Sequence, residues 1–66
     1  MVVEIVENGR KLGYIKAVAY NYSRFSVTKN KQRAKKYKNF DHATCDIEYC
    51  SGLPITFQRG LMYFVV

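Results

Sequence analysis

A single helix in the segment FDHATCDIEYCSGLP, residues 40–54, organises the predicted fold. Asp41 is a favoured residue type for a helix N-cap, and Phe40 before it can act as the hydrophobic staple. The helix is therefore expected over residues 42–51. Gly52 suits the C′ position that follows a helix, and the proline at the end of the segment forbids continuation.

One face of this helix is apolar. Ala43, Ile47 and Cys50 lie within about 60° of one another at about 3.6 residues per turn, so we expect them to form the buried stripe. The residues expected to point to water on the opposite face are Thr44, Glu48 and Ser51.

Two antiparallel strands joined by a tight turn are predicted before the helix. Residues 1–7 form the first and residues 12–20 the second, and Asn8-Gly9 between them is typical of a type I′ turn. The register of such a hairpin matches one charge pair and two apolar pairs. The expected facing pairs are Glu7 with Arg10, Ile5 with Leu12, and Val3 with Tyr14.

A third antiparallel strand is predicted over residues 24–28, after a turn at residues 21–23. Its alternating pattern directs Phe25 and Val27 inward. In the preceding strand the same alternation places three residues on one face: Ile15, Ala17 and Ala19.

Two further strands are predicted after the helix. Residues 55–58 alternate, Arg59-Gly60 can turn the chain, and residues 61–66 are apolar on both faces. The last strand is then either central in the sheet or exposed at an edge, where a homodimer is possible. The whole chain, residues 1–66, is expected to be one α+β domain. It would be a small twisted antiparallel sheet with one helix packed on a face, in the order ββ(β)αββ.

Positive charge is concentrated in one segment. The chain has eleven Lys and Arg against five Asp and Glu, a net charge of +6, and residues 29–38 alone carry six positive charges. We expect a loop or short helical turn there, anchored to the core by Ala34 and Tyr37, with cations that the core does not need. The candidate partner-binding residues are Lys29, Lys31, Arg33, Lys35, Lys36, Tyr37, Lys38, Arg24, Tyr20 and Tyr22.

Three interpretations of this segment remain open. Cations neutralise phosphates while aromatic rings stack on bases, which is typical of nucleic-acid binding. The rings concerned are Tyr20, Tyr22, Phe25 and Tyr37. The same surface suits an acidic groove on a protein, because opposite charges steer association. The third interpretation is a solvated loop whose lysines only maintain solubility.

Motifs for catalysis and metal binding are weak. The chain has neither a glycine-rich phosphate loop nor a Cys-x-x-Cys or His-Glu-x-x-His pattern. His42, Cys45 and Asp46 have the spacing of part of a metal site, but tetrahedral zinc sites need four ligands. We expect His42 to be a polar residue of the helix start paired with Asp46. The chain is therefore expected to be no enzyme, with no catalytic residue, metal or cofactor.

A cytoplasmic location is expected. No run of about 18 apolar residues is present to span a membrane, and the N-terminus lacks the features of a secretory signal. Cys45 and Cys50 point apart on a helix, so they are expected to remain free thiols, as in a reducing compartment.

Residues 25–43 resemble a pattern of small bacteriophage and prophage proteins. In that pattern a strand ends in Val/Thr, a Lys/Asn turn and Ala-Lys-Lys-aromatic follow, and a short helix has an early Ala. The matching residues are Val27, Thr28, Ala34, Lys35, Lys36, Tyr37, Phe40 and Ala43.

The resemblance implies a phage-type protein in the cytoplasm of a bacterial host. It implies a non-catalytic role: binding to a host nucleic-acid-handling or defence complex, as anti-CRISPR or anti-restriction proteins do, and inhibiting or redirecting it. Direct, largely sequence-independent binding of RNA or DNA is the alternative.

Overall fold

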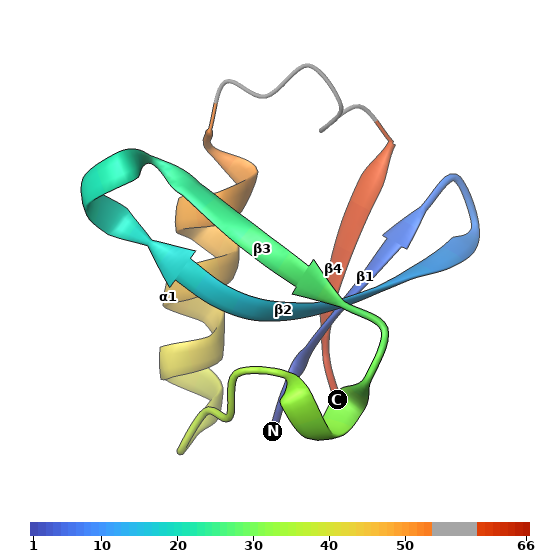
Figure 1. The fold of residues 1–66 in the computed structure, drawn as a ribbon, viewed down its shortest axis with the longest axis horizontal. Coiled ribbons are helices and arrows are strands. Elements are labelled where there is room, and N and C mark those ends of the chain that lie inside the picture. Colours follow the sequence, from blue (N-terminus) through green and yellow to red (C-terminus); the bar gives the residue numbers. More distant parts are fainter. Residues whose placement is uncertain (54–59) are drawn as a thin grey trace.

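The computed structural model of the protein describes residues 1–53 and 60–66 (Figure 1). Its strands form one antiparallel sheet in the order β3-β2-β1-β4. With a single α-helix in the described residues, this is the predicted α+β class. The elements are β1 (Val3–Glu7), β2 (Arg10–Ala19), a 3-10 turn η1 (Tyr20–Tyr22), β3 (Arg24–Thr28), a second 3-10 turn η2 (Lys31–Arg33), α1 (Phe40–Ser51) and β4 (Leu61–Val65).

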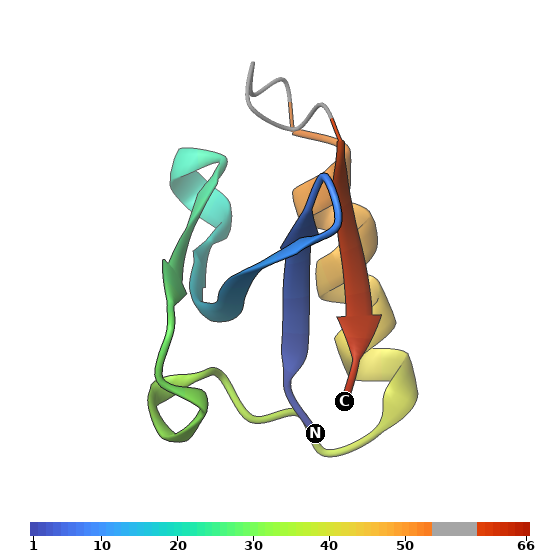
Figure 2. The ribbon, with the colours of Figure 1, turned by 90° about the vertical axis from the view of Figure 1, so that its right-hand side faces the viewer.

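The helix packs on one face of the sheet, alongside β4 (Figures 1 and 2). Between the two layers lies the main core, to which β1 contributes Val3 and Ile5 and β2 contributes Ile15. From the helix come Ala43 and Cys50, both fully buried. Ile47, predicted in the same stripe, is only partly buried against this core.

The first hairpin begins as predicted and then changes register. Asn8 and Gly9 both have positive φ, 50° and 83°, as a type I′ turn requires, and Glu7 pairs with Arg10. Beyond Val6 a β-bulge shifts the pairing, so Ile5 faces Gly13. The predicted pairs Ile5–Leu12 and Val3–Tyr14 are therefore wrong, because simple alternation does not anticipate an extra residue in one strand.

Gly13 lies beside this bulge, where β2 approaches β3 closely. A Cβ atom at its position would lie 2.6 Å from the backbone oxygen of Thr28 in β3. Only a residue without a side chain allows β2 and β3 to approach so closely here.

A second irregularity lies between β2 and β3. Ile15 faces Val27, but Ala17 faces Ser26, so Lys16 is the extra residue. Val18, and not Ala17, then packs against the core together with Phe25. The predicted face shared by Ile15 and Ala17 is wrong for this reason, and Val27, predicted inward, is exposed.

The helix starts two residues before the predicted start. Asn39 is the N-cap, and its side chain accepts a hydrogen bond from the backbone N–H of His42 at 3.0 Å. Asp41 therefore lies inside the first turn, and Phe40 is 55% exposed and does not act as a staple. Gly52 is the C-cap itself, in a right-handed conformation, and donates its N–H to the Glu48 carbonyl.

β4 pairs with β1 and has no second neighbour among the strands of the described residues. Leu61, Tyr63 and Val65 pack against the core, whereas Met62 and Phe64 are exposed. The strand predicted over residues 55–58, and Arg59 of the predicted turn, lie outside the described residues. No helix within residues 1–53 and 60–66 is long and apolar enough to cross a membrane.

The close approach at Gly13 predicts a specific loss of stability. Gly13→Ala should lower the free energy of unfolding by about 2 to 3 kcal/mol, because the new methyl group overlaps backbone that cannot move aside. The control is Gly9→Ala, where a Cβ meets nothing within 4 Å and only the positive φ is strained. That variant should lose about 1 kcal/mol. Urea unfolding followed by circular dichroism measures both, and equal losses would contradict the packing argument.

Candidate functional site

The basic segment, residues 29–38, is an ordered loop that we call the basic loop. Its first part is a 3-10 turn in which the Asn30 side chain accepts a hydrogen bond from the Gln32 N–H at 2.9 Å. Ala34 and Tyr37 are 5% and 7% exposed, so they anchor the loop as predicted. The loop backbone is also tied to the sheet, because the Lys35 N–H donates to the Ile15 carbonyl at 2.9 Å.

Four cations of this loop point to solvent. Their side chains form no hydrogen bond or ion pair with any residue in the described ranges. They are Lys29, Lys31, Arg33 and Lys38, all exposed. A fixed backbone that carries several unpaired cations presents positive charge with little freedom left to lose on binding.

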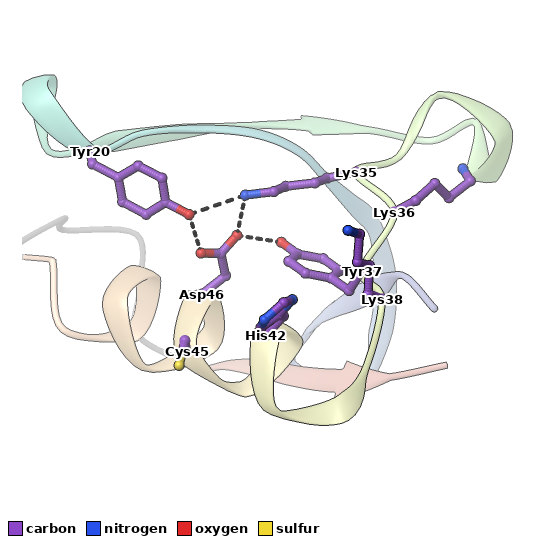
Figure 3. Close-up of a pocket in the computed structure, with 8 residues that line it drawn as sticks. All are labelled: Tyr20, Lys35, Lys36, Tyr37, Lys38, His42, Cys45 and Asp46. Carbon is purple, nitrogen blue, oxygen red and sulfur yellow. Dashed lines mark hydrogen bonds and ion pairs between the residues drawn. The ribbon is translucent and has the colours of Figure 1, made fainter.

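Lys36 has a structural role in the same loop. Its ammonium group donates to three backbone carbonyl oxygens, those of Lys31, Gln32 and Ala34, at 2.9, 3.2 and 3.0 Å. These bonds join the Lys36 side chain to the backbone of the 3-10 turn and of Ala34. Figure 3 shows the side chain directed away from the other pocket residues. The charge pattern of the segment does not predict these contacts of Lys36 with the loop backbone.

Lys35 is the second exception, because it pairs with a buried carboxylate. Its Nζ lies 2.8 Å from Oδ2 of Asp46, which is only 4% exposed, and 3.1 Å from the Tyr20 hydroxyl (Figure 3). The Tyr37 hydroxyl donates to the same Oδ2 at 2.6 Å, and the Tyr20 hydroxyl donates to Oδ1. One carboxylate on α1 thereby holds side chains from η1 and from the basic loop.

The charges within this cluster compensate one another. Burial alone would raise the pKa of Asp46, but the hydrogen bonds from Lys35, Tyr20 and Tyr37 outweigh it and lower that pKa below its usual range. Burial and the bond to Asp46 raise the pKa of Tyr37, and the bond to Asp46 raises the pKa of Tyr20. Near neutral pH the cluster therefore holds an ionised Asp46, a charged Lys35 and two protonated tyrosines.

The four rings of the predicted aromatic platform are mostly engaged in contacts within the protein, although Tyr20 is 50% exposed. Tyr37 is buried, Phe25 is half-buried, and the Tyr20 ring packs edge-on against Tyr49 at 5.1 Å between centroids. Only Tyr22, 73% exposed, offers an open face, and the Arg24 guanidinium already lies 5.5 Å from its centroid. Among the rings singled out from the sequence, one is thus fully available for stacking.

A shallow pocket of about 390 Å³ opens beside the Asp46 cluster. The basic loop forms one wall and the first turns of α1 form the other (Figure 3). Its lining residues are Tyr20, Lys35, Lys36, Tyr37, Lys38, His42, Cys45 and Asp46.

The expected pairing of His42 with Asp46 is replaced in this pocket. Lys35 and the two tyrosines occupy the Asp46 oxygens instead. The described residues contain no group of three or more His, Cys, Asp or Glu side chains placed to hold a metal ion. Cys45 is exposed and Cys50 is buried, neither forms a disulfide, and burial raises the pKa of Cys50 to about 11.

The spacing of His42 and Asp46 predicted a pairing between them and did not predict the burial of Asp46. The available signal was its spacing, three residues after Ala43 and four before Cys50, which places it on the buried side of the helix. A carboxylate there requires donors from elsewhere, and the nearby basic segment contains them.

The Asp46 cluster predicts a large effect of a small substitution. Asp46→Asn removes the charge that Lys35 neutralises and weakens the bonds from both tyrosines, so the free energy of unfolding should fall by about 2 to 4 kcal/mol. Asp41→Asn, an exposed carboxylate in the same helix, is the matched control and should lose less than about 1 kcal/mol. Urea unfolding at pH 7 measures both, and similar losses would show that the cluster is not a main source of stability.

The same cluster predicts acid sensitivity. The pKa of Asp46 is lower in the folded than in the unfolded protein, where it is about 3.9, so its stabilisation is complete above that value. The stabilisation is lost as the pH falls through the folded pKa. The melting temperature should therefore drop more steeply below about pH 4 in the parent than in Asp46→Asn. If the melting temperatures of the parent and of Asp46→Asn fall in parallel from pH 7 to pH 2, Asp46 is excluded as the titrating group.

Comparison with protein-family models, with curated proteins and with solved structures finds no match for this chain.

Proposed function

We propose that the protein is a non-catalytic binding protein of phage type, which attaches to a host nucleic-acid-handling or defence complex through the basic loop and inhibits or redirects it. The observation that carries the proposal is the set of four exposed, unpaired cations on an anchored loop. Internal contacts account for Lys35 and Lys36, but none accounts for Lys29, Lys31, Arg33 and Lys38 in the described part of the chain.

An acidic protein surface is the favoured partner. Binding to single-stranded nucleic acid draws on aromatic rings that stack on bases, and Tyr37 and Tyr20 are held by Asp46. An acidic groove needs only complementary charge and shape, which an ordered cationic loop supplies. Acidic surfaces that mimic nucleic acid fit such a loop, whereas a surface that binds phosphates is itself basic and would repel it.

Direct binding of RNA or DNA is the second candidate. Tyr22 and Arg24 favour it, because at the start of β3 they form an exposed ring and cation pair that could stack on an unpaired base. Contacts to phosphates by the loop cations would add affinity without reading sequence.

A pull-down from bacterial lysate, with and without nuclease, tests the proposal. We expect the tagged parent to recover one stoichiometric protein complex that survives nuclease treatment. Lys31→Glu combined with Arg33→Glu should abolish recovery, because repulsion replaces attraction at the loop. Arg10→Glu combined with Lys16→Glu is the matched control. It makes the same change in net charge at exposed positions outside the loop, and it should retain recovery.

Two results would overturn this proposal. Nuclease-sensitive recovery of many proteins would replace it with direct nucleic-acid binding. Equal recovery by the parent and the loop variant, with both folded by circular dichroism, would show that the cations only maintain solubility.

A further inference from the structure

The pocket beside the Asp46 cluster has donors that the fold does not use. The Lys35 ammonium has three N–H donors, of which Asp46 and Tyr20 accept two. The Lys35 side chain remains 34% exposed on the pocket wall. Lys38 and His42 line the same pocket, and neither side chain has a partner among the described residues.

The Lys35 ammonium is also held in a defined position. It lies between the Tyr20 and Tyr37 rings, 5.4 and 5.3 Å from their centroids, while Asp46 fixes it from below. A solvent-exposed lysine loses side-chain entropy when it binds a ligand, but folding has already removed most of that entropy from Lys35. Lys35 is therefore the preorganised cation of this pocket.

We propose that the pocket binds one carboxylate side chain, an Asp or Glu, of an acidic protein partner. The third Lys35 N–H and the Lys38 ammonium would donate to its oxygens, and the carbon atoms of the tyrosine rings would contact its methylene groups. This inference rests on the proposed function and deepens it, because it names the chemical group that the loop would recognise.

The charges facing the pocket favour a singly charged ligand. Lys35 and Lys38 are positive, Asp46 is negative, and Lys36 is turned away to the backbone of the 3-10 turn. One negative charge balances the remainder, whereas a phosphate monoester would add a second negative charge close to Asp46. A phosphodiester carries one charge but has a sugar on either side, so it reaches a pocket less readily than a side-chain terminus.

Nuclear magnetic resonance titration of the intact protein with an end-blocked tetraglutamate peptide, at constant ionic strength, tests the pocket. Saturable shifts are expected at the amides of His42, Cys45 and Asp46. Lys38→Gln should weaken the peptide about three- to fivefold, the contribution of one exposed ion pair. Lys16→Gln, the same change at an exposed position outside both the pocket and the basic loop, should leave the affinity unchanged.

The proposal is overturned if both variants weaken the peptide equally, or if the shifts follow Lys29 to Arg33 and spare the helix. It is also overturned if a short DNA duplex shifts the same amides and binds more tightly than the peptide does. The titration needs no host partner. If the peptide binds but no complex is recovered from lysate, only the proposed function is rejected. If a complex is recovered but the peptide does not bind, only the proposed pocket is rejected.

Discussion

The structure depends on one buried carboxylate. Asp46 accepts hydrogen bonds from a lysine and two tyrosines, Lys35, Tyr37 and Tyr20, which belong to η1 and the basic loop. A buried charge without such donors would be strongly destabilising, so the helix can pack as it does only when η1 and the basic loop are in place. The cluster therefore couples the elements that the small hydrophobic core alone would hold weakly.

This coupling divides the basic segment into two kinds of cation. Lys35 and Lys36 turn inward, one to a carboxylate and the other to backbone carbonyls, and they hold the loop in shape. The remaining cations point outward from that fixed backbone. A run of charges that would be a solvated, mobile face in isolation becomes an ordered surface, because two of its cations, Lys35 and Lys36, form the contacts that hold the loop.

Two β-bulges give the sheet the shape that this arrangement needs. One lies opposite Ile5 and Val6 and the other at Lys16, and bulges increase the local twist and bend of a strand. In Figure 2, β2 diverges from β1, and β3 lies on the side of β1 opposite to the helix. The bulge at Lys16 also brings Val18 to the core and lets the chain reach Tyr20 with its hydroxyl directed at Asp46.

Local patterns in the sequence determined the class of fold, most of the strands, the first turn and the body of the helix. Asn8-Gly9 encodes its turn through positive φ, and Ala34 and Tyr37 marked the anchors of the loop, because such preferences are local. Tertiary structure decided the registers, the helix start at Asn39 and the partners of Asp46. Bulges and buried ion pairs depend on contacts between separate elements, so the spacing within one element does not encode them. Which lysines serve the fold and which point to solvent was likewise decided in the folded chain, by the Asp46 carboxylate for Lys35 and by backbone carbonyls of the loop for Lys36.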